Sequence, residues 1–195
     1  QQMKRVKALK DAGADADAKR FEELRVLFQK YGTQYNFDPL MLAAQGYQES
    51  QLNQNAKSHV GAIGVMQVMP ATGAELKVGD IRVTEANIHA GTKYMDQLMT
   101  RYFKDADFDA ANRALFAFAS YNAGPGNIAK MRKEAAKRGL NPDKWFNNVE
   151  MVTAEKIGIE TTTYVRNIFK YYTSYKLTVE AQKARDKARG EVGKK

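Results

Sequence analysis

The sequence predicts an all-α protein, with at most a short β element in residues 51–69. Apolar residues recur at helical spacing over most of the chain. The clearest stretch places one face at Ile88, Gly91, Met95, Leu98 and Tyr102. Glycines, prolines and polar clusters separate such stretches and indicate where helices end. With 195 residues, of which 44% are hydrophobic, the chain can form one domain with a substantial core.

The helical patterns divide the chain into a central domain and two flanking segments. Residues 1–18 are charged and rich in alanine, and Gly13 interrupts them, which predicts a linker or N-terminal extension. Residues 179–195 are charged and are expected to form a helical or frayed tail. The domain is therefore expected over residues 19–178. Its expected helices cover residues 19–35, 38–50, 70–79, 84–102, 110–121, 127–138 and 160–178.

Charge and composition narrow the classes of function. The net charge is +9, and residues 130–195 hold sixteen Lys and Arg against eight Asp and Glu. A basic surface suits a polyanionic partner such as nucleic acid or peptidoglycan, or it serves solubility only. The chain has no cysteine, and its two histidines, His59 and His89, lack metal-ligand spacing. We expect His89 to be a surface or packing residue. The longest apolar run is too short to span a bilayer.

The stretch around Glu49 is the strongest candidate for chemistry. Asp38 is expected to cap a helix that has Pro39 at its first position and ends near Ser50. Glu49 then lies in the last turn, where the negative end of the helix dipole and apolar neighbours disfavour its charged form. A raised pKa is what a general acid in glycosidic cleavage needs. A single glutamate at a helix end is more often simply solvated, so the later motifs decide.

Three later segments complete a pattern with Glu49-Ser50. They are residues 64–70 (Gly-Val-Met-Gln-Val-Met-Pro), 120–126 (Ser-Tyr-Asn-Ala-Gly-Pro-Gly) and 160–165 (Glu-Thr-Thr-Thr-Tyr-Val). Their order and spacing resemble the soluble-type (SLT) lytic transglycosylases of the goose-type lysozyme superfamily, over about residues 20–178. Asn87-Ile88, Gly91 and Tyr94 look like that family's middle helix. Two small departures are Ser120, where alanine is frequent, and Val68, where isoleucine or leucine is frequent.

The resemblance implies a lysozyme-like helical fold and a non-hydrolytic reaction. Glu49 would protonate the MurNAc-β-1,4-GlcNAc glycosidic oxygen and then act as base on the 6-hydroxyl, which gives a 1,6-anhydroMurNAc end. Substrate-binding roles are implied at six positions: Ser50, Met66, Gln67, Tyr121, Asn122 and Tyr164. Tyr164 would bond near Glu49 while Glu160 positions its helix.

Three residues keep alternative readings. Met66 and Met69 read as flexible cleft wall or as core, with core favoured for Met69. Trp145, the only tryptophan, reads as a sugar platform or as a packing residue.

The resemblance also implies a partner and a place. The expected partner is the peptidoglycan glycan strand, in the periplasm or cell envelope, with no nucleic acid, metal or cofactor. We expect a monomer, with no membrane span in these residues and any membrane anchor outside them. Three alternatives stay open: a lysozyme-like muramidase, a non-catalytic wall-binding module and a basic nucleic-acid-binding domain. The muramidase would need a second carboxylate, and the nucleic-acid domain has no supporting motif.

Overall fold

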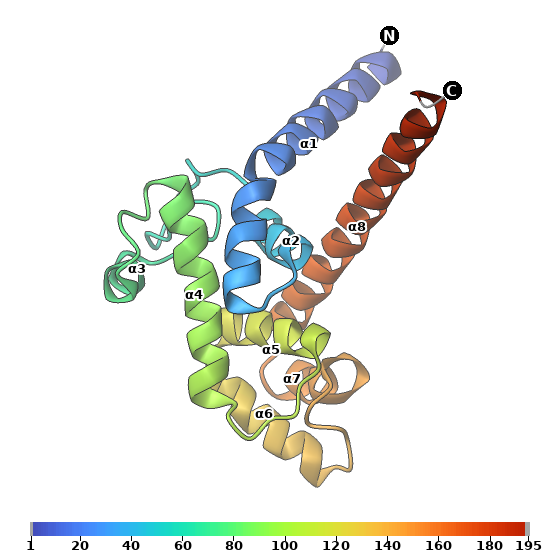
Figure 1. The fold of residues 1–195 in the computed structure, drawn as a ribbon. Coiled ribbons are helices and arrows are strands. Elements are labelled where there is room, and N and C mark those ends of the chain that lie inside the picture. The colour runs from blue at the N-terminus through green and yellow to red at the C-terminus, as the bar shows by residue number, and fades with distance from the viewer. Residues whose placement is uncertain (1, 194–195) are drawn as a thin grey trace.

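The computed structural model describes the backbone of residues 2–193 and the side chains of residue 4 and residues 15–193. Within this part the predicted all-α class is confirmed (Figure 1). The helices are α1 (Gln2–Tyr35), α2 (Pro39–Ser50), α3 (Pro70–Leu76), α4 (Thr84–Tyr102), α5 (Ala110–Ala123), α6 (Pro125–Lys137), α7 (Glu150–Lys156) and α8 (Ile159–Gly193). An irregular helical turn, η1 (Trp145–Val149), precedes α7. The β element consists of two isolated antiparallel bridges, Lys57–Ile63 and Ile63–Val68.

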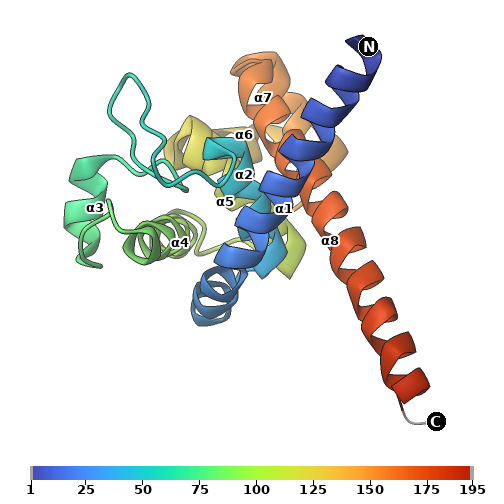
Figure 2. The same cartoon turned by 90° about the horizontal axis from the view of Figure 1, so that it is seen from above.

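The two terminal helices are longer than the sequence predicts. The helix α1 begins at Gln2 and passes through Gly13 without a break, so residues 2–18 are helical. One glycine costs only about 1 kcal/mol in a helix, which an alanine-rich stretch tolerates. The helix α8 likewise continues to Gly193. Figure 1 shows both ends projecting beyond the helical body, and Figure 2, seen from above, shows them diverging from each other. Residue 1 and residues 194–195 lie outside the described residues.

Other helix ends shift by a few residues. The helix α6 begins at Pro125 rather than at the expected residue 127. Thr84 is the first residue of α4, and Val83 is its N-cap. None of the helices in the described range is long and apolar enough to cross a membrane.

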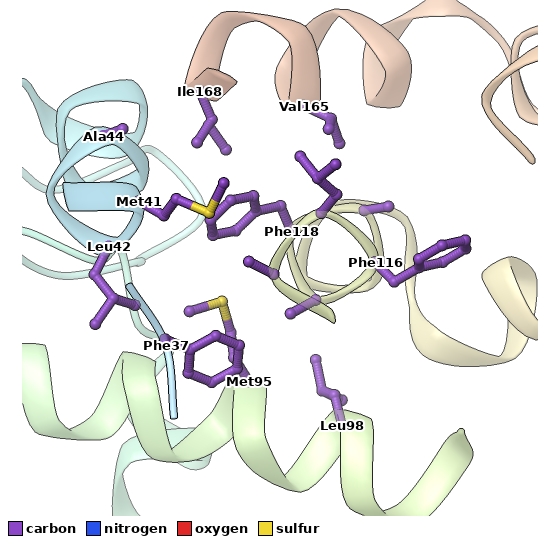
Figure 3. Close-up of a cluster of buried hydrophobic side chains, with 14 of the residues drawn as sticks. Phe37, Met41, Leu42, Ala44, Met95, Leu98, Phe116, Phe118, Val165 and Ile168 are labelled. Carbon is purple, nitrogen blue, oxygen red and sulfur yellow. The ribbon is translucent and has the colours of Figure 1, made fainter. Parts of the chain in front are cut away.

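The core is built around α5. Every side chain from Ala114 to Ser120 is buried, as expected for a helix that is apolar all round. Figure 3 shows α5 end-on, with α2, α4 and α8 around it. Phe118 points between Met41 of α2 and Ile168 of α8 in this view, and Leu98 of α4 approaches from the opposite side. This arrangement brings α2 and α8, which are far apart in sequence, into extensive contact.

Trp145 and His89 both have packing roles. The Trp145 side chain is fully buried, and its ring meets Phe116 edge-on with centroids 5.6 Å apart. The interpretation of Trp145 as a sugar platform is therefore wrong. The His89 ring stacks on Tyr31 at 4.4 Å, and its Nε2 lies 2.8 Å from the Tyr35 hydroxyl. This agrees with the expected packing role.

Candidate active site

The helix α2 forms as predicted and places Glu49 in its last turn. Asp38 accepts a hydrogen bond from the Leu40 amide at 2.8 Å, and Pro39 follows at the first helical position. Gln51 ends the helix in the left-handed conformation, with φ 55°. Glu49 is thereby held on a rigid element, half-buried, beside α8.

Glu49 belongs to a chain of hydrogen bonds between α2 and α8. The Tyr164 hydroxyl donates to Glu49 Oε1 at 2.5 Å. The same phenol oxygen accepts a hydrogen bond from Gln45 Nε2 at 3.2 Å. Gln45 and Glu49 lie four residues apart, on one face of α2. The carboxyl group is thus oriented by a side chain that comes 115 positions later in the sequence.

Burial governs the ionisation of this group. It raises the pKa of the Glu49 carboxyl, and the hydrogen bond from Tyr164 lowers that pKa by a smaller amount. The pKa of Tyr121 is raised well above its usual range by burial and then by the charge of Glu49. The pKa of Tyr164 is raised by burial and by Glu49. Among the described residues, Tyr121 and Tyr164 are therefore neutral phenols beside Glu49.

The loop of residues 51–69 is tied to Glu49's helix by Ser50. The Ser50 hydroxyl contacts the carbonyl oxygens of Val65, at 2.8 Å, and Gly46, at 3.1 Å. The Tyr121 hydroxyl donates to the Met66 carbonyl at 2.7 Å, which fixes the loop to α5. Ser50 and Tyr121 thus hold the loop beside the end of α2, and their hydroxyl groups are engaged by protein atoms.

Asn87 of α4 also anchors this loop. This fully buried side chain accepts a hydrogen bond from the Met66 amide at 2.8 Å. Its Nδ2 donates to the carbonyls of Ile63 and Ile81. A Cβ at Gly64, where φ is 80°, would lie 2.4 Å from that Nδ2. Glycine at position 64 is therefore required both by the backbone conformation and by the approach of Asn87.

Gln67 and Asn122 keep only part of their hydrogen-bonding capacity for a ligand. Gln67 Nε2 donates to the carbonyls of Ala56 and Gly64, which leaves its Oε1 as an acceptor. Asn122 is exposed, and its Oδ1 accepts from the Thr161 hydroxyl at 2.7 Å, which leaves its Nδ2 as a donor. Because Thr161 lies one helical turn before Tyr164, Asn122 is joined to the same end of α8.

The two methionines are placed opposite to the expectation. Met66 is fully buried and packs against Gly91, whereas Met69 is 42% exposed. The Met66 side chain is core because Asn87 and Tyr121 bind its backbone and turn the residue inward. The prediction that its side chain binds substrate is therefore wrong for this structure.

Three residues that build the site are not predicted from the sequence: Gln45, Asn87 as a loop anchor, and Thr161. A signal existed for Gln45, since a glutamine interrupts the apolar run Met41–Gly46 one turn before Glu49. Glu160, which was expected to position α8, lies exposed in its first turn. Among the hydrogen bonds between described residues, Thr161 rather than Glu160 makes the contact to Asn122.

Comparison with known proteins places the chain in a family. The model described as the transglycosylase SLT domain matches residues 26–143. The chain is 34% identical over 166 residues to membrane-bound lytic murein transglycosylase F of Desulfosudis oleivorans, covering 78% of this chain and 36% of that protein. For the Haemophilus influenzae protein of that name, the identity is 31% over 181 residues, with 85% and 37% covered. The chain belongs to the SLT transglycosylase family and spans little more than a third of these relatives.

Solved structures agree on the fold. The 70 kDa soluble lytic transglycosylase SLT70 of Escherichia coli aligns with a TM-score of 0.61 at 28% identity, over 78% of this chain and 24% of that one. An inactive mutant of lytic transglycosylase Slt from Pseudomonas aeruginosa aligns with a TM-score of 0.62 at 24% identity, over 80% and 24%. The predicted lysozyme-like helical fold is thereby confirmed.

Proposed function

We propose that this chain is a catalytic domain that cleaves the MurNAc-β-1,4-GlcNAc bond of peptidoglycan and leaves a 1,6-anhydroMurNAc end. The observation that carries the proposal is the setting of Glu49. Its carboxyl is half-buried at a helix end, has a raised pKa and is oriented by the Tyr164 hydroxyl. A carboxylic acid with a raised pKa that is held in one orientation suits general acid catalysis.

The reaction needs only one carboxyl group, used twice. Glu49 gives its proton to the glycosidic oxygen as the bond to C1 breaks, while the substrate's 2-acetamido oxygen bonds to C1. The Glu49 carboxylate then takes the proton of the 6-hydroxyl. The O6 atom attacks C1, displaces the acetamido oxygen and closes the anhydro ring. The enzyme ends with its proton restored, and no water is consumed.

The groups beside Glu49 favour this route over hydrolysis. A hydrolase that uses two carboxylates needs the second one about 5–9.5 Å from the first. Among the described residues, Glu49 is the only carboxylate that influences the pKa of Tyr121 or of Tyr164. The neutral tyrosines can orient a carboxyl group and a sugar, but they do not replace a water-activating base.

The remaining polar groups suit an N-acetylated sugar. Among the described residues neither Asn122 Nδ2 nor Gln67 Oε1 has a hydrogen-bond partner, so the first can donate to a carbonyl oxygen and the second can accept from an amide or a hydroxyl. We assign Tyr121 and Ser50 to the support of the loop that carries Gln67. The substrate would be a peptidoglycan glycan strand, which places the protein in the bacterial cell envelope. The net charge of +9 suits the carboxylates of that polymer.

Product analysis tests the proposal against a muramidase. Purified peptidoglycan sacculi are digested, and the released muropeptides are weighed by mass spectrometry. We expect anhydro-muropeptides, lighter by one water than the reducing-end products of hydrolysis. Products with reducing ends would establish the muramidase, and binding to sacculi with no release would establish a wall-binding module.

A further inference from the structure

We propose that Gln45 is a positioning residue that acts on Glu49 through the Tyr164 hydroxyl. The inference rests on the proposed role of Glu49 as acid and base. Gln45 does not contact the reacting atoms itself, because its side chain is fully buried between α2 and the core.

The geometry gives the bonds a direction. The phenol of Tyr164 has one proton, which it donates to Glu49 at 2.5 Å. Its oxygen is then an acceptor, and Gln45 Nε2 donates to it at 3.2 Å. Gln45 thus donates to Tyr164 and Tyr164 donates to Glu49, and these two bonds together fix the rotation of the Tyr164 hydroxyl. Without Gln45, Glu49 is the one hydrogen-bond partner left to that hydroxyl among the described residues.

The line of bonds also strengthens its last member. A donor to the phenol oxygen favours the ionised form of the phenol, and Gln45 accordingly lowers the pKa of Tyr164, against the larger effect of burial. A more acidic phenol is a stronger donor to a carboxylate. Gln45 therefore supports the charged form of Glu49, which is the form needed to take the proton of the 6-hydroxyl.

Packing alone does not explain a glutamine at this position. The Gln45 Oε1 atom is buried without a hydrogen-bond partner among the described residues. A buried, unpaired carbonyl costs folding free energy that leucine would not. The residues around it on α2 are apolar, including Met41, Leu42 and Ala44. The amide is thus retained at a structural cost, and its one hydrogen bond leads to Tyr164.

The test compares Gln45→Leu, Tyr164→Phe and the double variant with the parent protein. The first readout is the titration of the Glu49 carboxyl by NMR with ¹³C-labelled glutamate, assigned with Glu49→Gln. The groups that face this carboxyl are Tyr164 from α8 and Tyr121 from α5, with Tyr94 of α4 edge-on to Tyr121. Neither tyrosine is altered by Gln45→Leu, so a shift in that variant reports on the bond from Tyr164.

We expect Gln45→Leu to raise the pKa of Glu49, because the hydrogen bond that lowers it becomes weaker. Tyr164→Phe should raise that pKa further, and the double variant should match Tyr164→Phe. In a digest of sacculi, Gln45→Leu should lower kcat about fivefold, the worth of one hydrogen bond, and move the alkaline limb of the pH profile to higher pH. Its melting temperature should not fall.

Two results would overturn the inference. One is an unchanged Glu49 pKa in Gln45→Leu, and the other is an equal shift from Gln45→Leu in the parent and in the Tyr164→Phe background. Gln45→Met, which keeps the length of the side chain without the amide, replaces Gln45→Leu if that variant does not fold. Since the NMR titration needs no turnover, an inactive parent protein would count against the proposed function only.

Discussion

The position of Glu49 follows from the local sequence, whereas its ionisation depends on the fold. Its position at the end of α2 follows from Asp38, Pro39 and the polar residues after Ser50, which are visible in the sequence. Its ionisation depends on burial and on Tyr164, which only the fold brings near. A carboxyl group in this setting is destabilised when it is charged.

The difference in stability between Glu49→Gln and the parent protein should therefore depend on pH. The pKa of Glu49 is raised in the folded state, so its contribution to stability is fully present below the unfolded-state pKa and is lost as pH rises through the folded-state value. The glutamine variant has no such loss. We expect its melting temperature, relative to the parent, to rise between about pH 4 and pH 8.

Thermal melts of both proteins across that pH range measure this difference. A control is Gln48→Glu in the same turn, which adds a carboxyl group next to the site. A difference between parent and Glu49→Gln that stays constant or falls with rising pH would contradict a raised pKa.

Sequence reasoning was least complete for residues that act through other residues. Glu49 could be identified because an acid at a helix end was followed by three motifs in order. For Gln45 the sequence shows a glutamine within an apolar run but not its role, because its partner lies 119 positions away and glutamine is an ordinary helix residue. Met66 was misplaced because its motif position does not reveal which way the loop turns it.

At the level of elements, the loop of residues 51–69 depends on close contact with α4. Met66 lies directly against Gly91, where an added Cβ would come within 2.7 Å of the Met66 Cβ. The glycine at 91 is thus explained by the loop that packs on it. The sequence predicted a buried face on residues 84–102 but not this contact.

Gly91→Ala should displace the loop and destabilise the protein by about 1–3 kcal/mol, although alanine favours a helix. In a chain of this size that is a fall in Tm of several degrees. The rate of cleavage should fall even at temperatures where the variant stays folded, because Met66 carries the bonds to Asn87 and Tyr121 that hold the loop. Calorimetry and a digest of sacculi measure the two effects.

Gly126→Ala is the matched control, since a Cβ there meets nothing within 4 Å. It should melt at or above the temperature of the parent. If Gly91→Ala melts like this control, the contact between α4 and the loop does not constrain the fold.

For the whole molecule, the buried apolar side chains described on the two terminal helices stop short of the projecting ends. The first buried apolar side chain described on α1 is Phe21, and the last on α8 is Val179. Asp17 accepts a hydrogen bond from the Tyr47 hydroxyl at 3.0 Å, which ties α1 to α2 before residue 19. The boundaries 19–178 stay a prediction, and they rest on the apolar pattern, which burial follows, while helix length follows local propensity.

A fragment of residues 15–183 should keep the fold and the activity. We expect its melting temperature to lie within about 4 °C of that of residues 1–195, which corresponds to about 1 kcal/mol in a chain of this size. Calorimetry of both proteins and the same digest of sacculi provide the check. A larger fall, or a loss of cleavage, would show that the projecting helices support the domain.

The measurement that tests the account most directly is a digest of one batch of sacculi by the parent protein and by Glu49→Gln, with melting temperatures recorded for both. Because one carboxyl group serves as acid and as base, the loss should be at least about 10⁴-fold, the upper end for general acid–base catalysis. We predict that the parent releases anhydro-muropeptides while the folded variant binds sacculi and releases none above background. A variant that melts like the parent and releases the same products at a comparable rate would show that Glu49 is not the catalytic acid.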